Sequence, residues 1–150
     1  MLIQSALGQT PSEVLTTFKK SAKSKDFDET WKHVAQFEKL PTQITDYLKQ
    51  KVQRHISYFS NDSDFQIIEE RIDGDCAVVV INENNKRGVA SFDIDPVYLI
   101  KQNGEWRVFP EISDWKIERN VLGEDVEATY QKLKIWYNER EEALKKQHKN

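Results

Sequence analysis

The sequence predicts a single α+β domain, with three N-terminal helices packed on a four-stranded antiparallel meander and a long C-terminal helix after it. Two changes of pattern predict this class. Apolar residues recur at helical spacing up to residue 59, follow strand spacing from residue 65 to 112, and return to helical spacing from residue 124. Helices that are separated along the chain from an antiparallel sheet are typical of α+β domains.

The first helix is predicted to begin at Pro11 and to end near Lys25. Thr10 is a suitable N-cap, Pro11 suits the first helical position, and Glu13 completes a capping box. One apolar stripe then follows at helical spacing: Val14, Leu15, Phe18 and Ala22. This stripe is expected to face the sheet.

Two further helices are expected before the strands begin. Asp28 is predicted to cap a short second helix, which Leu40-Pro41 ends. The apolar face of that helix would consist of Trp31, Val34 and Ala35. A third helix over residues 42–59 carries a longer stripe: Ile44, Tyr47, Leu48, Val52, Ile56 and Phe59.

Four strands are predicted at residues 65–72, 75–82, 88–100 and 105–112. Asp73-Gly74 joins the first two and Asn103-Gly104 the last two, and both dipeptides are strong signals for a two-residue hairpin turn. After Gly123, the last helix is expected over residues 124–147.

The second hairpin turn also predicts a register. It places Lys101 opposite Trp106, Leu99 opposite Val108 and Val97 opposite Pro110. These side chains then share the face that lies beneath the helices.

Upstream in the same strand the apolar residues have the opposite parity. Phe92 and Ile94 are apolar, whereas Asp93 and Asp95 are polar. A bulge adds one residue and restores the phase, and proline favours such a position. We therefore expect a bulge or sharp bend at Asp95-Pro96, which would turn Phe92 and Ile94 toward the helices and both aspartates toward water.

The opposite face of the second hairpin is apolar as well, through Tyr98, Ile100 and Phe109. A sheet with one solvated face would alternate cleanly, and an exposed apolar patch would mark an interface. Either the C-terminal helix or a second copy of the chain could cover this face of the sheet. Tyr98, Ile100 and Phe109 are therefore candidate interface residues of a homodimer.

Three stretches resemble a known family: Asp26-Phe27-Asp28 followed by Trp31, "RIDGDCAVVVI" at 71–81, and the hairpin from Leu99 to Val108. Over residues 11–112 the chain resembles the nuclear transport factor 2-like superfamily, and within it small bacterial domains of unknown function. The resemblance implies a cone: a curved sheet with helices on its concave side, a pocket at the open end, and frequent dimerisation through the outer face. It implies no particular function, because this fold serves many.

The expected organisation has three parts. Residues 1–9 form a flexible start or a signal-peptide remnant, residues 10–123 the α+β domain, and residues 124–150 the C-terminal helix and tail. The start lacks a basic segment and its apolar run is short, so both interpretations of it remain open. Two localisations therefore remain: the protein is cytoplasmic, or it is exported and its signal peptide has been trimmed. We expect no membrane span, because no run of about 18 apolar residues occurs.

The sequence lacks the residue patterns typical of metal sites, reactive cysteines, cofactor sites and nucleic-acid binding. The three histidines, His33, His55 and His148, fall on separate predicted helices without ligand spacing, so no metal site is expected. Cys76, the single cysteine, lies in a strand that should be buried and is expected to be structural. No cofactor motif is found, and an acidic middle of the chain, within a net charge of −3, argues against nucleic-acid binding.

The predicted function is a non-enzymatic ligand-binding or protein-interaction domain. Trp31, His55, Tyr58 and Trp106 are candidate residues of a pocket for a small apolar ligand. The alternative is a small-molecule enzyme of the isomerase, cyclase or dehydratase type, with Asp93 or Asp95 as an acid–base group inside the cone. A third hypothesis has the C-terminal helix docking on a partner.

Overall fold

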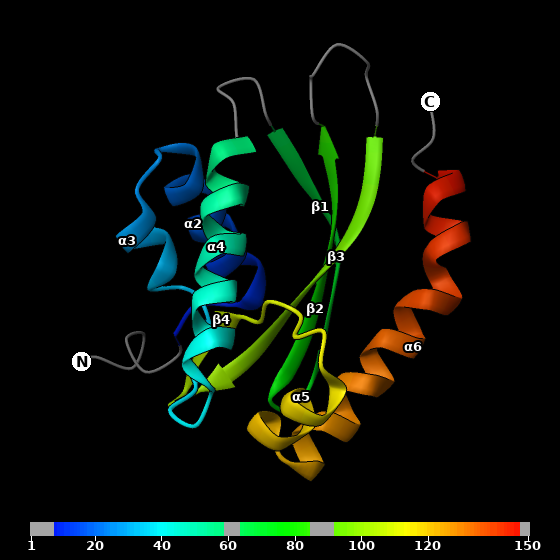
Figure 1. Cartoon of the computed structure of the whole chain (residues 1–150). Helices are drawn as coiled ribbons and strands as arrows, with labels where there is room; N and C mark the ends of the chain where they lie inside the picture. Colours follow the sequence, from blue (N-terminus) through cyan, green and yellow to red (C-terminus); the bar gives the residue numbers. More distant parts are fainter. Residues whose placement is uncertain (1–7, 59–63, 85–91, 148–150) are drawn as a thin grey trace, which may run out of the picture.

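The structure is a computed structural model that describes residues 8–58, 64–84 and 92–147. Figure 1 shows three layers: the N-terminal helices on one side, the sheet in the middle and the last helix on the other side. The elements are α2 (Pro11–Lys23), α3 (Phe27–Trp31), α4 (Thr42–Tyr58), β1 (Asp64–Asp73), β2 (Cys76–Asn84), β3 (Phe92–Gln102), β4 (Glu105–Val108), α5 (Trp115–Leu122) and α6 (Glu124–Gln147). The α+β class is confirmed, with the strands in the order β1-β2-β3-β4 expected of a meander.

The start of α2 is as predicted. The Glu13 N–H donates to Thr10 Oγ1 at 3.1 Å, and Pro11 is the first helical residue. The stripe of α2 packs into one core cluster with α4 and the sheet, where Leu15 and Ala22 are fully buried. The bounds of α4 follow the prediction through Tyr58, but Tyr47 of the expected stripe is 40% exposed, and Phe59 lies outside the described residues.

The prediction for the second helix is wrong in its cap and its length. Asp26, not Asp28, caps α3, by accepting a hydrogen bond from the Glu29 N–H at 3.1 Å. Val34 does not belong to the helix but forms a parallel bridge with Val108 of β4. The Val108 N–H donates to the His33 carbonyl and the Ala35 N–H to the Val108 carbonyl, both at 2.8 Å. The edge of β4 thus provides hydrogen-bond partners for the backbone of this segment, which follows the end of α3 at Trp31.

The register of the second hairpin is confirmed where β4 is present. Lys101 pairs with Trp106 and Leu99 with Val108. β4 ends at Val108, however, so Val97 has no strand partner at Pro110. Of the predicted strand 88–100, residues 88–91 lie outside the described part of the chain.

The predicted bulge at Asp95-Pro96 is wrong. The β2–β3 register runs without a shift from Ile81–Asp95 through Val80–Pro96 to Val79–Val97. Within the described sheet, the register shifts between Ile67 and Glu69 of β1. Because β4 has already ended, β3 has only β2 as a neighbour at Pro96, a position that tolerates proline.

The predicted bulge keeps the apolar residues before and after Pro96 on one face of β3. Both faces are covered: Ile94, Tyr98 and Ile100 are all buried in the cluster that includes α6, whereas Leu99 belongs to the cluster of α2 and α4. The parity of the apolar residues therefore never switches. As a consequence, Asp95 shares the helix-facing side of β3 with Leu99.

The chain's own last helix covers the outer face of the sheet. α6 begins and ends as predicted, and its Tyr130 ring packs edge-on against Tyr98 and Phe109, with centroid distances of 5.1 and 5.3 Å. The Tyr137 hydroxyl donates to the Ile94 carbonyl at 3.3 Å. Of the two covers considered from sequence, the C-terminal helix is the one that the structure shows.

Two smaller findings complete the fold. The short helix α5 was not predicted; the Asp114 side chain caps it by accepting from the Lys116 and Ile117 N–H groups at 3.0 and 3.3 Å. Among the described residues, no helix has the length and apolar character needed to cross a bilayer.

Candidate functional site

The four predicted pocket residues do not converge on one cavity. Tyr58 is 56% exposed, and Trp31 is partly buried with its ring stacked on Phe27 at 6.0 Å. Trp106 is 8% exposed and lines a different cavity from His55. Only His55 lies in the cavity described next.

A cavity of about 270 Å³ lies between α2, α4 and the helix-facing side of β2 and β3. We call it the helix–sheet pocket. Its apolar lining comes from distant parts of the chain: Leu15, Phe18, Val52, Ile81, Val97 and Pro110. Its polar lining is Lys19, Lys51, His55, Glu83 and Asp95. A mostly apolar wall with a few polar groups is typical of small-molecule sites, and this volume is at the small end of their range.

His55 forms part of the apolar wall in its neutral form. Its ring stacks on Phe18 at a centroid distance of 5.6 Å. Burial, and then the positive charge of Lys19, lower the pKa of His55 to about 4. The imidazole is therefore neutral at pH 7.

An ion pair crosses the pocket from α2 to β2. Lys19 Nζ lies 3.0 Å from Glu83 Oε1, and the Lys19 side chain is 6% exposed against 26% for Glu83. A buried ammonium needs such a partner, because desolvation without one is costly. The positive charge of Lys19 is therefore balanced by the carboxylate of Glu83.

Asp95 stands at the exposed edge of the pocket. Partial burial of its carboxyl group, followed by the negative charges of Glu83 and Asp93, raises its pKa. Asp93 is exposed on the same side of β3, opposite Glu83 in the register, and does not line the pocket. The bulge predicted at Pro96 would turn both aspartates toward water; without it, Asp93 is exposed and Asp95 borders the pocket.

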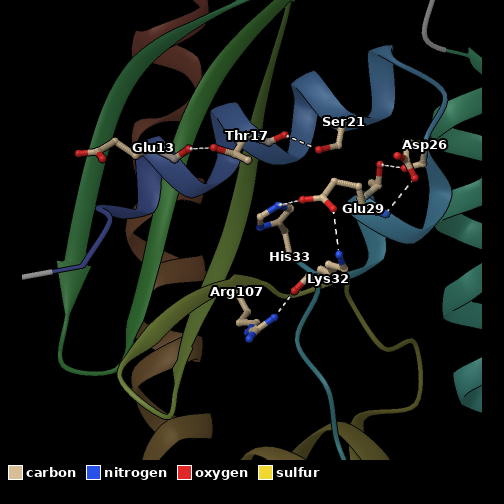
Figure 2. A network of polar contacts seen from close by, with 9 residues as sticks. Glu13, Thr17, Ser21, Asp26, Glu29, Lys32, His33 and Arg107 are labelled. Atoms are coloured by element: carbon tan, nitrogen blue, oxygen red, sulfur yellow. Dashed lines mark hydrogen bonds and ion pairs between the residues drawn. The ribbon is translucent and has the colours of Figure 1, made fainter. Parts of the chain in front are cut away.

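A second cavity, of about 350 Å³, lies beside Trp106 at the start of α2 and the end of α3. Figure 2 shows three residues of its lining, Lys32, His33 and Arg107, within a wider network of polar contacts. Arg107 donates to the Lys32 carbonyl and pairs with Glu105 at 3.1 Å. Lys32 and His33 lie 3.1 and 3.8 Å from the Glu29 carboxylate. Arg107 and Lys32 each have a carboxylate partner, and burial lowers the pKa of His33, so this cavity is the weaker candidate for a ligand.

Cys76 is not activated as a nucleophile. Cys76 is buried, and burial together with Asp75 and Asp73 raises its pKa to about 11, so the thiol stays protonated. Across the three described ranges, no cluster of three histidine, cysteine or acidic side chains could hold a metal ion.

Comparison with known proteins agrees with this geometry at the level of the fold. A family model described as "Domain of unknown function (DUF4878)" matches residues 5–109. A search of the curated proteins finds no match. Since the family model ends at Phe109, α5 and α6 lie beyond it.

Two solved bacterial structures share the fold. One, from Campylobacter jejuni, is described as an NTF2-like transpeptidase; it is 17% identical, has a TM-score of 0.55, and the match covers 69% of this chain and 100% of that one. The other, from Thiobacillus denitrificans, is described as a calcium/calmodulin-dependent protein kinase type II association domain; it is 9% identical, has a TM-score of 0.53, and the match covers 70% and 98%. At these identities the likeness concerns the fold alone, which is nuclear transport factor 2-like, as the sequence predicted.

Proposed function

The chain belongs to the DUF4878 family of domains of unknown function, and from this premise we propose that it binds a small, largely apolar molecule in the helix–sheet pocket without transforming it. Family and fold leave the ligand open, so the proposal depends on the pocket itself.

The observation that supports binding is an apolar wall that remains open to solvent. Beneath the same helices, Ala22 and Leu99 are fully buried. At the helix–sheet pocket, the side chains of Phe18, Val52 and Val97 instead border a cavity of about 270 Å³. A ligand that displaces water from this wall gains the free energy of apolar burial.

Benzyl alcohol is a suitable neutral probe, because it combines an aromatic ring with one polar group. We expect saturable shifts in ¹H–¹⁵N spectra of the labelled protein, confined to the pocket-lining parts of α2, α4, β2 and β3. The dissociation constant should be on the order of 1 mM for so small a ligand.

Val97→Phe should weaken the binding of benzyl alcohol by filling part of the pocket. The larger side chain projects into the pocket from a partly exposed position, so benzyl alcohol should bind at least about tenfold more weakly. Ile67→Phe is the control, because Ile67 is 40% exposed on β1 and does not line the pocket. Shifts that scatter over the surface, or that survive Val97→Phe, would contradict the proposal.

One observation keeps an enzyme as the second candidate. Asp95 lines the pocket with a raised pKa, the property that a carboxyl general acid or base needs. Against this, Lys19 and Glu83 are engaged with each other, and within the described ranges no hydrogen bond orients Asp95. A bound molecule recovered chemically changed after incubation would favour the enzyme.

The homodimer expected from sequence is a separate hypothesis, and it concerns the outer face of the sheet. Its candidate interface residues Tyr98, Ile100 and Phe109 are each no more than 5% exposed in the single chain, because α6 covers them. A second copy cannot reach them while α6 is in place. The hypothesis that α6 docks on a partner loses support for the same reason.

We therefore expect the intact chain to be a monomer in solution. Light scattering after size-exclusion chromatography should give a mass near 17.6 kDa even at high protein concentration. A mass near twice this value would show that another surface, or a displaced α6, mediates self-association.

A further inference from the structure

We propose that the ligand of the helix–sheet pocket is a cation: a small amine with an apolar body, which binds with its ammonium group beside the Asp95 carboxylate. This inference depends on the proposed function, and it adds the charge of the ligand and the residue that selects it.

The buried charges of the lining are already balanced. Lys19 and Glu83 form an ion pair at 3.0 Å, and His55 is neutral at pH 7. The deep part of the pocket therefore offers an apolar surface with no net charge. It neither attracts nor repels an ion strongly.

The other cation of the lining is directed elsewhere. Lys51 Nζ donates to the Glu111 carbonyl at 3.2 Å and lies 5.8 Å from the centre of the Tyr47 ring. Both partners lie outside the lining of the pocket. Lys51 is thus a poor counter-ion for an anionic ligand, since such a ligand would have to displace these contacts.

The carboxylate at the pocket edge lacks a cation of its own. Within the described ranges neither Asp95 nor Asp93 forms an ion pair. The lysines whose charges act on Asp95 are Lys19 and Lys145, and each is held by a different carboxylate: Lys19 by Glu83, and Lys145 by Glu141 at 2.7 Å. The strand register adds to the negative charge by setting Glu83 opposite Asp93.

These neighbours make the position of Asp95 favourable for a bound cation. Its pKa is raised by partial burial and by the carboxylates of Glu83 and Asp93, which shows that its negative charge is poorly compensated. An ammonium group at this edge would reduce that repulsion. The ring or chain attached to it would lie against Phe18, Val52 and Val97.

Three probes of similar shape isolate the charge: benzylamine, benzyl alcohol and benzoate. Titrated into the intact protein at pH 7 and low salt, benzylamine should bind about fivefold more tightly than benzyl alcohol, and benzoate more weakly than either. A partly exposed ion pair contributes at about this level.

Asp95→Asn should abolish the preference, so that benzylamine binds no more tightly than benzyl alcohol measured on the same variant. Asp93→Asn is the matched control: it removes the same charge from the same face of β3, two residues away and outside the lining, and should retain most of the preference. Both side chains are exposed, so both variants should fold.

The outcomes separate the two proposals. Equal affinities for benzylamine and benzyl alcohol, tighter binding of benzoate, or a preference that survives Asp95→Asn would overturn the cation inference alone. Failure of all three probes to bind the folded protein would overturn the proposed function and this inference with it.

Discussion

Replacement of Tyr130 by alanine is expected to lower the free energy of unfolding by about 3–5 kcal/mol, the usual cost of truncating a buried aromatic ring. Tyr130 is 1% exposed, and its ring contacts Tyr98 and Phe109, so the truncation leaves a cavity between α6 and the sheet. Urea unfolding followed by circular dichroism measures the change. A loss of this size would show that α6 is part of the folded unit, although it lies beyond the family match.

Two variants act as controls for Tyr130→Ala. Tyr130→Phe keeps the ring and removes a buried hydroxyl that has no hydrogen-bond partner among the described residues, so stability should stay the same or rise by up to about 1 kcal/mol. Ile135→Ala alters a side chain of α6 that is 57% exposed and should change stability by no more than about 0.5 kcal/mol. If Tyr130→Ala were as mild as Ile135→Ala, the docking of α6 on the sheet would be refuted.

Acidification is expected to destabilise the protein through His55 by up to about 3 kcal/mol. The pKa of His55 is about 4 in the folded protein and 6.5 in the unfolded chain. Between these values the unfolded chain binds more protons, so stability falls as the pH is lowered from 6.5 and the loss is complete below about 4. Urea midpoints measured across this range would show the effect.

The comparison with His55→Gln isolates the histidine. Asp95 and Glu118 have raised pKa values, and their protonation stabilises the folded state on acidification, so the pH profile of the parent protein is a sum of opposing effects. Subtracting the profile of His55→Gln leaves the loss due to His55 between pH 6.5 and 4. A direct NMR titration should place the midpoint of His55 near 4, and a midpoint near 6.5 would rule out its burial in the pocket wall.

Much of the fold could be predicted because the decisive signals are local. Thr10 and Pro11 start α2 through contacts within one helical turn, and Asn103-Gly104 determines the register of the hairpin within four residues. α6 has the predicted bounds because Gly123 precedes an uninterrupted helical pattern. In each case the partners of an interaction are close together in the chain.

The candidate site could be predicted only in part. His55 was identified, but the rest of the pocket comes from α2, β2 and β3, and no sequence pattern showed that Lys19 and Glu83 would meet across it. The prediction for Asp95 was wrong because it kept the apolar residues before and after Pro96 on one face of β3, whereas each face buries its own set. A run of apolar residues on both faces of β3 was the available signal, and a sheet covered on both sides would have placed Asp95 correctly.

The sequence by itself thus determined α2, α4, α6 and the Asn103-Gly104 turn, since these depend on the conformational preferences of neighbouring residues. Only the tertiary structure decided that α6 covers the outer face, that the segment from His33 to Ala35 joins the edge of β4, and that Asp95 faces the pocket. Each of these depends on free energy gained between residues far apart in the chain, where apolar area is buried and backbone groups find partners.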